Sequence, residues 1–524
     1  MPKNIVVCSD GTGNQDIKGR GTNVFKLFEA VDLNEHRTDP ALDTQLAFYD
    51  DGVGTKGNAL LKTLGGAAGY GLKRNVKELY REISRVYDPG DRIFLFGFSR
   101  GAFTVRTLAG MIGKCGLLKG GDFHTARGLR HAVEHAYDAY RAQYHSTLSD
   151  AVGRVLRWPD GPTALATFNA KYHPHQNVPI AFLGVWDTVD AVGMPFSIAE
   201  FVNSRIYQFK FSTRDLGRHV VKACHALSID DTRLAFEPIL WQGDPRIEQV
   251  WFAGVHSNVG GGYPKQGMSL VALDWMLAHA ERAGLRLQHL DRELFRGHAT
   301  VDDLMYNPRS GMGVFYQWGP RDVLAYCRRS GSHPAIHLSV AERIAHATDD
   351  YAPGNIPSGA SVVITPVEMA DPKREEKERL LEMRAGAIEK SLADALGERY
   401  LLHEVQNYVR IGTASYVALL LAGLLLGVSL SLLTGGLVFS QPWLRAGELA
   451  AIGGLTALLV AAAASRVANS GLEDHFSLFW QQNQNSLRDA LKYSKIVARQ
   501  QSGISPTPSF VDREAGPADG AATV

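Results

Sequence analysis

Short apolar segments alternate with longer segments of mixed polarity over the first 370 residues of the chain. The apolar segments have the length of buried strands and lie at Ile5–Ser9, Gln45–Tyr49, Arg92–Gly97, Pro179–Val185 and Ile247–Val255. The mixed segments predict helices at Asn23–Val31, Tyr70–Val86, Ala102–Gly113, Thr213–Leu227 and Leu270–Ala283. This alternation predicts an α/β fold in which a mostly parallel sheet carries helices on both faces.

The pattern changes after this α/β domain, which we place at residues 1–370. Residues 371–410 are densely charged and predict a helical linker. Ile411–Leu444 then contains no charged residue and exceeds the ~20 apolar residues that a bilayer span needs. A shorter apolar segment, Leu449–Ser465, follows a turn, so residues 411–466 predict a two-helix transmembrane hairpin. The alternative is a buried helical pair within a soluble protein.

The flanks of the hairpin predict its orientation and its packing. Arg410 and Arg466 lie at its outer ends, which places both termini and the α/β domain on the cytoplasmic side. Gly423 and Gly427, together with Gly453 and Gly454, predict close contact between the two helices. Residues 467–502 predict an amphipathic helix, and residues 503–524, rich in Pro, Gly and Ala, predict a disordered tail.

Composition narrows the classes of function. A chain of 524 residues with 45% hydrophobic content can bury one large core. Its 55 Lys and Arg residues balance 54 Asp and Glu residues, so the charge gives no support for a nucleic-acid partner. The four cysteines lie far apart and predict reduced core thiols, and no metal-ligand spacing or cofactor motif is present.

Two inserted segments and the N-terminal residues carry separate expectations. The segments at about 122–174 and 194–211 interrupt the α/β order and are either lids over a pocket or helical decoration. Residues 1–9 lack the basic and apolar regions of a signal peptide, so we expect them to form the first strand.

Ser99 lies in the motif Gly97-Phe98-Ser99-Arg100-Gly101, between a predicted strand and a predicted helix. This is the sequence form of a nucleophile elbow, in which a sharp strand-to-helix turn exposes one serine. Glycines two residues to either side remove the side chains that would clash in such a turn. The motif therefore predicts a serine hydrolase, and an inert serine in a glycine-rich turn is the alternative.

Asp187 and His256 complete a predicted catalytic triad. Each follows a predicted buried strand, and strand exits in a parallel sheet line one edge where ligands bind. The chain order Ser, Asp, His is that of α/β-hydrolases. Ser99 would attack a carbonyl, His256 would carry the proton, and Asp187 would orient the imidazole. Asp190 is a second choice for the acid, and helix capping is an alternative role for either aspartate.

The predicted oxyanion hole consists of backbone amides. The N–H of Arg100, directly after the nucleophile, supplies one donor by the geometry of the elbow. The loop Ser9-Asp10-Gly11-Thr12-Gly13-Asn14 follows the first strand, and its glycines allow amides to face the pocket. Gly11 and Thr12 are the donors we choose there, whereas Asp10 would hydrogen-bond within the loop.

Together these motifs, with Gly52-Val53-Gly54-Thr55 and Gly254-Val255-His256-Ser257-Asn258, resemble an uncharacterised α/β-hydrolase domain family. That family includes phospholipase effectors of type VI secretion, and the resemblance covers about 2–351. The segment Cys224–Trp241, interpreted as helical, also resembles the family. The family's triad maps onto Ser99, Asp187 and His256, and its activity implies ester cleavage in glycerophospholipids. Asn258 stands where the family often has an acidic residue.

Two functional hypotheses follow. The first is a membrane-associated serine esterase, phospholipase A-like, with a phospholipid or other acyl ester as substrate and the bilayer as partner. It would lie at a bacterial inner membrane with its catalytic domain in the cytoplasm, or be delivered into a target cell. A homo-oligomer and an immunity or secretion partner are compatible with both locations. The second hypothesis is a catalytically silent hydrolase fold that serves as a binding or assembly domain on a membrane scaffold.

Overall fold

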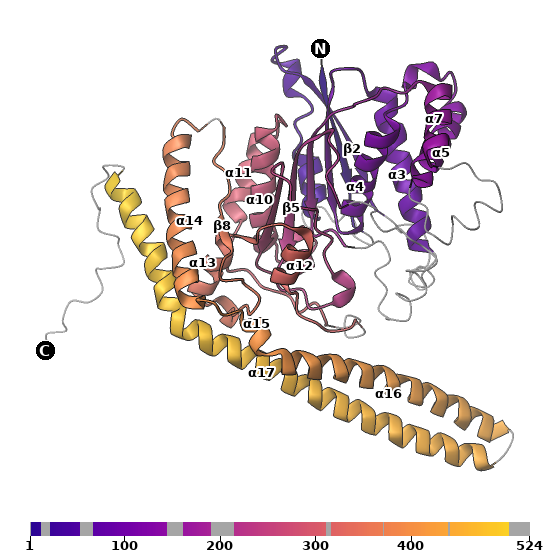
Figure 1. The fold of residues 1–524 in the computed structure, drawn as a ribbon, viewed down its shortest axis with the longest axis vertical. Coiled ribbons are helices and arrows are strands. Elements are labelled where there is room, and N and C mark those ends of the chain that lie inside the picture. Colours follow the sequence, from indigo (N-terminus) through magenta and orange to yellow (C-terminus); the bar gives the residue numbers. More distant parts are fainter. Residues whose placement is uncertain are drawn as a thin grey trace, which may run out of the picture.

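An α/β body carries a long helical hairpin in the computed structural model of the chain (Figure 1). The structure describes residues 2–11, 21–52, 67–143, 161–189, 214–310, 316–369, 371–438 and 441–501.

The body is built on one sheet of eight strands in the order β2-β1-β3-β4-β5-β6-β7-β8, and every neighbouring pair is parallel. The strands are β1 (Lys3–Ser9), β2 (Thr44–Asp50), β3 (Arg92–Phe98), β4 (Ile180–Trp186), β5 (Val220–Ser228), β6 (Ile247–Phe252), β7 (Ala335–His337) and β8 (Ser361–Val363). Because all strands run the same way, their carboxyl ends lie at one edge of the sheet.

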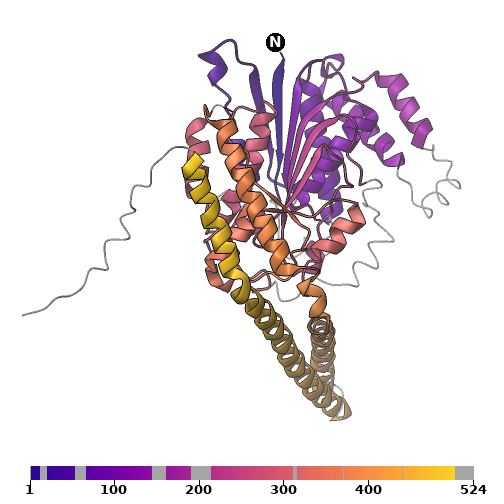
Figure 2. The ribbon, with the colours of Figure 1, turned by 60° about the vertical axis from the view of Figure 1, so that its left-hand side comes forward.

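Helices cover both faces of this sheet (Figure 2). They are α1 (Asn23–Ala30), α3 (Ala67–Val86), α4 (Arg100–Cys115), α5 (Ala126–Ala142), α7 (Gly161–Tyr172), α9 (His256–Gly260), α10 (Gly267–Arg282), α11 (His289–His298), α12 (Val323–Ser330), α13 (Leu338–His346), α14 (Arg374–Leu396), α15 (Leu401–Glu404), α16 (Gln406–Val438) and α17 (Gln441–Gln501). Successive side chains of a strand point to opposite faces. In β1, Ile5 and Val7 therefore join the core under α3, α4 and α5, whereas Val6 and Cys8 join the core under α1 and α10.

The mostly parallel α/β fold is confirmed, and the five predicted strands correspond to β1, β2, β3, β4 and β6. The helix predicted over Thr213–Leu227 is wrong, because β5 occupies Val220–Ser228. The helical interpretation of Cys224–Trp241 is wrong for the same reason. β5 lies between β4 and β6 in the centre of the sheet, and its polar residues His225 and Ser228 are fully buried there. Pairing on both sides therefore outweighs the helix-like pattern of the isolated segment.

The first inserted segment is helical decoration where the structure describes it. α5 and α7 pack beside α3 and α4, and their apolar side chains, such as Leu129, Val133 and Phe168, are buried in the core on that face of the sheet. The segment 194–211 lies outside the described residues. All four cysteines are buried and have free thiols, as predicted from their spacing.

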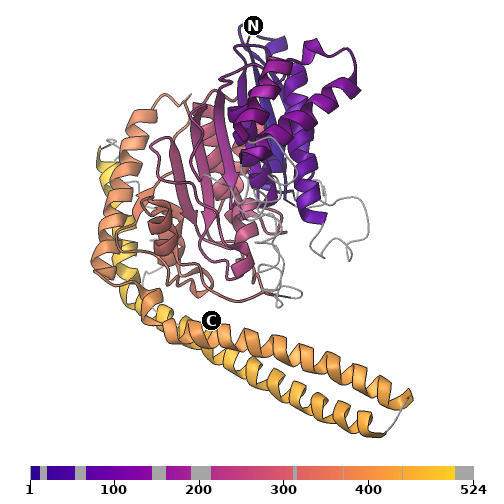
Figure 3. The ribbon, with the colours of Figure 1, turned by 45° about the vertical axis from the view of Figure 1, so that its right-hand side comes forward.

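The C-terminal helices do not follow the predicted boundaries. α17 is continuous from Gln441 to Gln501, so the boundary drawn at residue 466 falls inside one helix. Its last third packs on the body: the indole N–H of Trp480 donates to the carbonyl of Pro353 at 2.8 Å, and Leu487 is fully buried. The first part of α17 runs beside α16 as an antiparallel pair that projects from the body (Figure 3).

The hairpin presents many apolar side chains to its surroundings. Leu424 of α16 and Leu459 of α17 are 64% and 70% exposed. The described parts of the C-terminal helices contain two candidate membrane spans by length and composition, within Arg374–Leu433 and Arg445–Lys492. The close contact predicted at Gly423, Gly427 and Gly453 is wrong, because a methyl group at any of these positions would meet nothing within 4 Å. The contact predicted at Gly454 is confirmed, since the same methyl group there would lie 2.8 Å from Leu426.

Candidate active site

Ser99 occupies a strained turn between β3 and α4. Its φ of 58° and ψ of −121° lie in a region that residues with side chains rarely adopt. The turn is tight enough that a methyl group on Gly97 would lie 2.6 Å from the carbonyl oxygen of Gly101. A methyl group on Gly101 would overlap the backbone oxygen of Ser9 in β1. The two glycines thus allow β1, β3 and α4 to meet at the turn that carries Ser99.

His256 and Asp187 form a buried hydrogen bond at the same edge of the sheet. The imidazole Nδ1 lies 2.6 Å from the carboxylate Oδ2, and the two residues are 5% and 0% exposed. Asp187 directly follows β4, whereas His256 begins the short helix α9, four residues after β6. The strand exits that the sequence predicted therefore bring Asp187 and His256 together.

Two contacts fix this pair beside Ser99. The amide N–H of Ser99 donates to the carbonyl of Trp186, the residue before Asp187, at 3.1 Å. The ring of Phe98, the residue before Ser99, lies with its centroid 4.6 Å from that of His256. Within the described part of the chain, no hydrogen bond joins the Ser99 hydroxyl to the His256 ring. Asp187 and His256 are thus hydrogen-bonded to each other, and Ser99 follows a residue that packs on the His256 ring.

Arg321 binds both oxygens of Asp187 and is itself only 2% exposed. Its Nη1 lies 2.6 Å from Oδ1 and its Nη2 lies 2.9 Å from Oδ2. Ser228, at the end of β5, donates to the same carboxylate through its amide at 3.0 Å and through its hydroxyl at 3.2 Å. Asp187 thus accepts hydrogen bonds from three residues, and φ at Asp187 is also positive, at 38°.

These contacts determine the charge states at the site. Burial alone would raise the pKa of Asp187, but the charge of Arg321 and the hydrogen bond from His256 hold it well below the usual range. Burial lowers the pKa of His256 below its ordinary value, against the opposing effect of Asp187. The site therefore holds an ionised carboxylate and favours a neutral imidazole, which are the states a general base requires.

Two further carboxylates, those of Asp230 and Asp231, hold the backbone around His256. The N–H of His256 donates to Asp231 at 3.2 Å, and the N–H of Gly254 donates to Asp230 at 2.6 Å. Burial raises the pKa of Asp230 to about 6. Asn258 accepts from the N–H of Val255 at 3.4 Å and donates to the carbonyl of Leu304 at 3.1 Å. It joins the start of α9 to the neighbouring loop.

The predicted oxyanion donors have different positions. The N–H of Arg100 belongs to the first turn of α4, where helical amides have no partner within the helix. The N–H of Gly11 instead donates to the carboxylate of Asp10 at 2.6 Å. In this conformation Gly11 is therefore not available to a substrate oxygen, and Asp10 hydrogen-bonds within its loop. Thr12 lies outside the described residues, as does Asp190.

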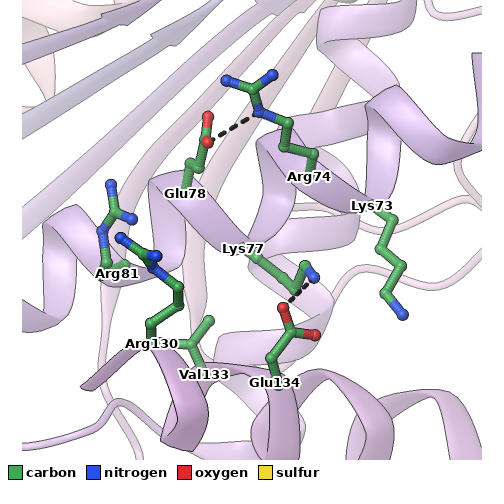
Figure 4. Close-up of a pocket in the computed structure, with 8 residues that line it drawn as sticks. All are labelled: Lys73, Arg74, Lys77, Glu78, Arg81, Arg130, Val133 and Glu134. Carbon is green, nitrogen blue, oxygen red and sulfur yellow. Dashed lines mark hydrogen bonds and ion pairs between the residues drawn. The ribbon is translucent and has the colours of Figure 1, made fainter. Parts of the chain in front are cut away.

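Two other hollows in the described structure lie away from these residues. Figure 4 shows a groove of about 550 Å³ between α3 and α5, lined by Lys73, Arg74, Lys77, Glu78, Arg81, Arg130, Val133 and Glu134. Carboxylates of the groove itself pair with two of its cations, Arg74 with Glu78 and Lys77 with Glu134. The second hollow, of about 560 Å³, is lined by residues that include Arg92, Val221 and His279. Neither hollow is lined by Ser99, Asp187 or His256.

The described residues include no group of three or more His, Cys, Asp or Glu that could hold a metal ion.

The sequence interpretation missed Arg321, Ser228 and Asp231. Ser228 and Asp231 lie at the end of β5, which was interpreted as a helix, so their position at a strand exit was not recognised. Arg321 lies in the connection before α12, 134 residues after Asp187, in a segment without a motif. Only the folded chain brings it to the acid.

The described residues thus combine a parallel α/β sheet, a strained serine turn and a buried histidine–aspartate pair at one edge of that sheet. The family described as type VI secretion system phospholipase effector Tle1-like, catalytic domain, matches residues 3–279, more than half of the chain. The chain therefore belongs to this family, and the resemblance to type VI secretion phospholipase effectors is confirmed.

Similar individual proteins include one from yeast and two of known structure. The uncharacterized protein YEL023C of Saccharomyces cerevisiae is 27% identical over 272 residues, which cover 48% of this chain and 34% of that protein. The crystal structure of an uncharacterized protein from Pseudomonas aeruginosa has 18% identity and a TM-score of 0.32, covering 75% of this chain and 59% of the other. The Tle1 effector bound to the VgrG spike of the type VI secretion system has 16% identity and a TM-score of 0.30, covering 50% and 52%. The chain spans about a third of the yeast relative and between half and two thirds of the two solved chains.

Proposed function

We propose that the chain is a membrane-associated serine hydrolase that cleaves carboxylic esters of glycerophospholipids, in the manner of a phospholipase A. The observation that carries the proposal is the strained Ser99 elbow beside the buried His256 and Asp187 pair. Membership of the phospholipase effector family supports the choice of lipid esters.

The residues suggest a two-step reaction. The Ser99 oxygen attacks the ester carbonyl, His256 takes the hydroxyl proton and then gives it to the leaving alkoxide, and a lysophospholipid departs. Water attacks the resulting acyl-enzyme in the second step and gives a proton to His256, and the fatty acid leaves as the serine recovers its proton. Asp187 keeps the imidazole oriented throughout, and the amide of Arg100 stabilises the oxyanion.

Product analysis on bilayers tests the proposal. The purified full-length protein is incubated with vesicles of mixed glycerophospholipids, and lipids are quantified by mass spectrometry. We expect fatty acid and lysophospholipid in equal amounts, together with covalent labelling by a fluorophosphonate. Absence of both products and labelling would contradict the proposal and favour the silent binding or assembly domain. The position of the remaining acyl chain identifies which ester is cut.

The hairpin of α16 and α17 is proposed to insert into the bilayer. Its exposed apolar side chains support this proposal, because a soluble surface rarely carries so many in one region. Insertion would keep the enzyme beside its substrate and raise the effective concentration of lipid. Arg410 and Arg466 favour a cytoplasmic position for the body.

A pair of charged substitutions tests membrane insertion. We expect Leu424→Arg with Leu459→Arg to reduce flotation with vesicles at least about tenfold, because each arginine near a span centre costs about 2.5–3.5 kcal/mol. The matched control is Leu290→Arg with Leu294→Arg in α11, where both leucines are also exposed, at 80% and 52%. This control adds the same charge outside the hairpin and should float like the unmodified protein. Equal flotation of both double variants would argue against insertion.

A further inference from the structure

Two carboxylate–guanidinium pairs lie on either side of His256. The first is Asp187 with Arg321, in which Nη1 of the guanidinium donates to Oδ1 of the carboxylate and Nη2 donates to Oδ2. The second is Asp231 with Arg233, at 2.6 Å and 3.0 Å. The carboxylate of the first pair accepts from the imidazole and that of the second accepts from the backbone N–H of His256. Among the described residues, two aromatic rings also pack against the imidazole, with the Phe98 and Phe236 centroids 4.6 Å and 4.9 Å away.

Arg321 is held in place by more than its ion pair. Its Nη1 also donates to the hydroxyl and the carbonyl of Ser228, at 2.6 Å and 2.7 Å, and its Nη2 donates to the carbonyl of Phe236 at 2.5 Å. Asn355 donates to the backbone carbonyl of Arg321 at 3.0 Å. A planar guanidinium with this many fixed acceptors has one orientation, and it fixes the carboxylate it faces.

We propose that Arg321 is a positioning residue that holds Asp187 against His256 and, by its positive charge, keeps the imidazole neutral at acidic pH. The inference rests on the function proposed above. An ionised aspartate normally stabilises the imidazolium form of its histidine partner. Here the guanidinium offsets much of that stabilisation, because the carboxylate and guanidinium together carry no net charge. The base therefore remains able to accept a proton at a lower pH than it would beside an unpaired carboxylate.

The test is the pH dependence of kcat/KM for the full-length protein and for Arg321→Gln. Removing the positive charge raises the proton affinity of His256, so the acid limb of the profile should move to higher pH by about one unit or more. The same shift should appear in the proton resonance of the His256 ring, assigned by its loss in His256→Gln. The resonance reports on the inference even if the wild-type protein proves inactive, which would refute only the proposed function.

Two controls separate charge from structure. Arg343→Gln removes another fully buried arginine, whose Nη1 donates to the carbonyl of Asp303 at 2.8 Å, and it should leave the acid limb and the His256 resonance in place. Ser228→Ala removes a hydroxyl that contacts both Asp187 and Arg321 without changing the charge, and it should lower kcat while the limb stays in place.

Arg321→Lys decides the case if Arg321→Gln does not fold. A lysine keeps the charge but cannot bridge both oxygens, so we expect an unmoved acid limb, an unchanged KM and a kcat about tenfold lower. The inference is overturned if folded Arg321→Gln shows the wild-type pH profile and His256 titration, or if Arg321→Lys has the wild-type kcat.

Discussion

Ser99→Ala should lower kcat for ester hydrolysis by about 10⁶-fold and abolish fluorophosphonate labelling, because the acyl-enzyme of the proposed reaction forms on the hydroxyl that this substitution removes. KM for the lipid should change little, since the serine hydroxyl contributes to the reaction more than to substrate binding. Initial rates on vesicles and the circular dichroism of the folded protein are the measurements. A variant that retains more than about one thousandth of the activity would show that Ser99 is not the nucleophile.

Ser99→Gly should be equally inactive but more stable than Ser99→Ala, by about 1 kcal/mol in the free energy of unfolding. The reason is the φ of 58° at this position, which strains any residue with a Cβ and does not strain glycine. The matched control is Ser470 in α17, an exposed serine in a regular helix, where Ser470→Gly should be less stable than Ser470→Ala by about 1 kcal/mol. Opposite signs of the difference between the glycine and alanine variants at the two serines would show that the turn at Ser99 stores strain. A Ser99→Gly variant less stable than Ser99→Ala would contradict this.

The strands that were predictable from the sequence are those whose own residues are nearly all apolar. β1, β3 and β4 are nearly continuous apolar segments, as strands covered on both faces must be. β5 carries buried His225 and Ser228 in place of apolar residues, and the reason for their burial lies in other segments: His225 accepts from the N–H of Thr188 at 3.1 Å, and Ser228 binds Asp187. β7 and β8 have three residues each, too few to show a period.

The candidate site likewise contains some residues that were predictable from the sequence and others that were not. Ser99, Asp187 and His256 were predictable in position because each lies within four residues of a strand end and within two residues of a glycine or a buried aromatic residue. Arg321 was not, since its partner is distant in sequence and its neighbours in sequence carry no pattern. The role of Gly11 was not predictable for a different reason. A glycine allows several orientations of its amide, and here the amide N–H is oriented by its hydrogen bond to the carboxylate of Asp10.

The location of Arg321 also relates the site to the hairpin. Trp318, three residues before it, packs with Tyr400, Leu402, Val405 and Leu472, which surround the base of the hairpin. The backbone of this segment is joined to the loop after β5 by hydrogen bonds between Gly319 and Thr232 at 2.8 Å and between Leu234 and Gln317 at 3.0 Å. Trp318 thus connects the base of the helices proposed to enter the bilayer to the chain segment that carries Arg321.

Asp187→Asn should lower kcat by about 10⁴-fold, because the amide no longer enforces the tautomer and orientation of His256 or stabilises the imidazolium. The same change should lower the free energy of unfolding by about 3–5 kcal/mol, because it leaves the charge of Arg321 buried without a counter-charge. Vesicle assays and urea unfolding measure the two effects separately. A wild-type rate would show that Asp187 is not the acid of the triad.

Adding Arg321→Met to Asp187→Asn should restore stability without restoring activity. Methionine is unbranched and apolar, although shorter than arginine, and removes the charge that the first substitution leaves unpaired, so about 1–4 kcal/mol of the loss should return. The rate should remain about 10⁴-fold low, since His256 still has no carboxylate. The two losses therefore have separate causes in one ion pair: unfolding responds to the charge left on Arg321, and the reaction responds to the charge missing from Asp187. If the double variant is no more stable than Asp187→Asn, the buried pair does not account for the stability loss.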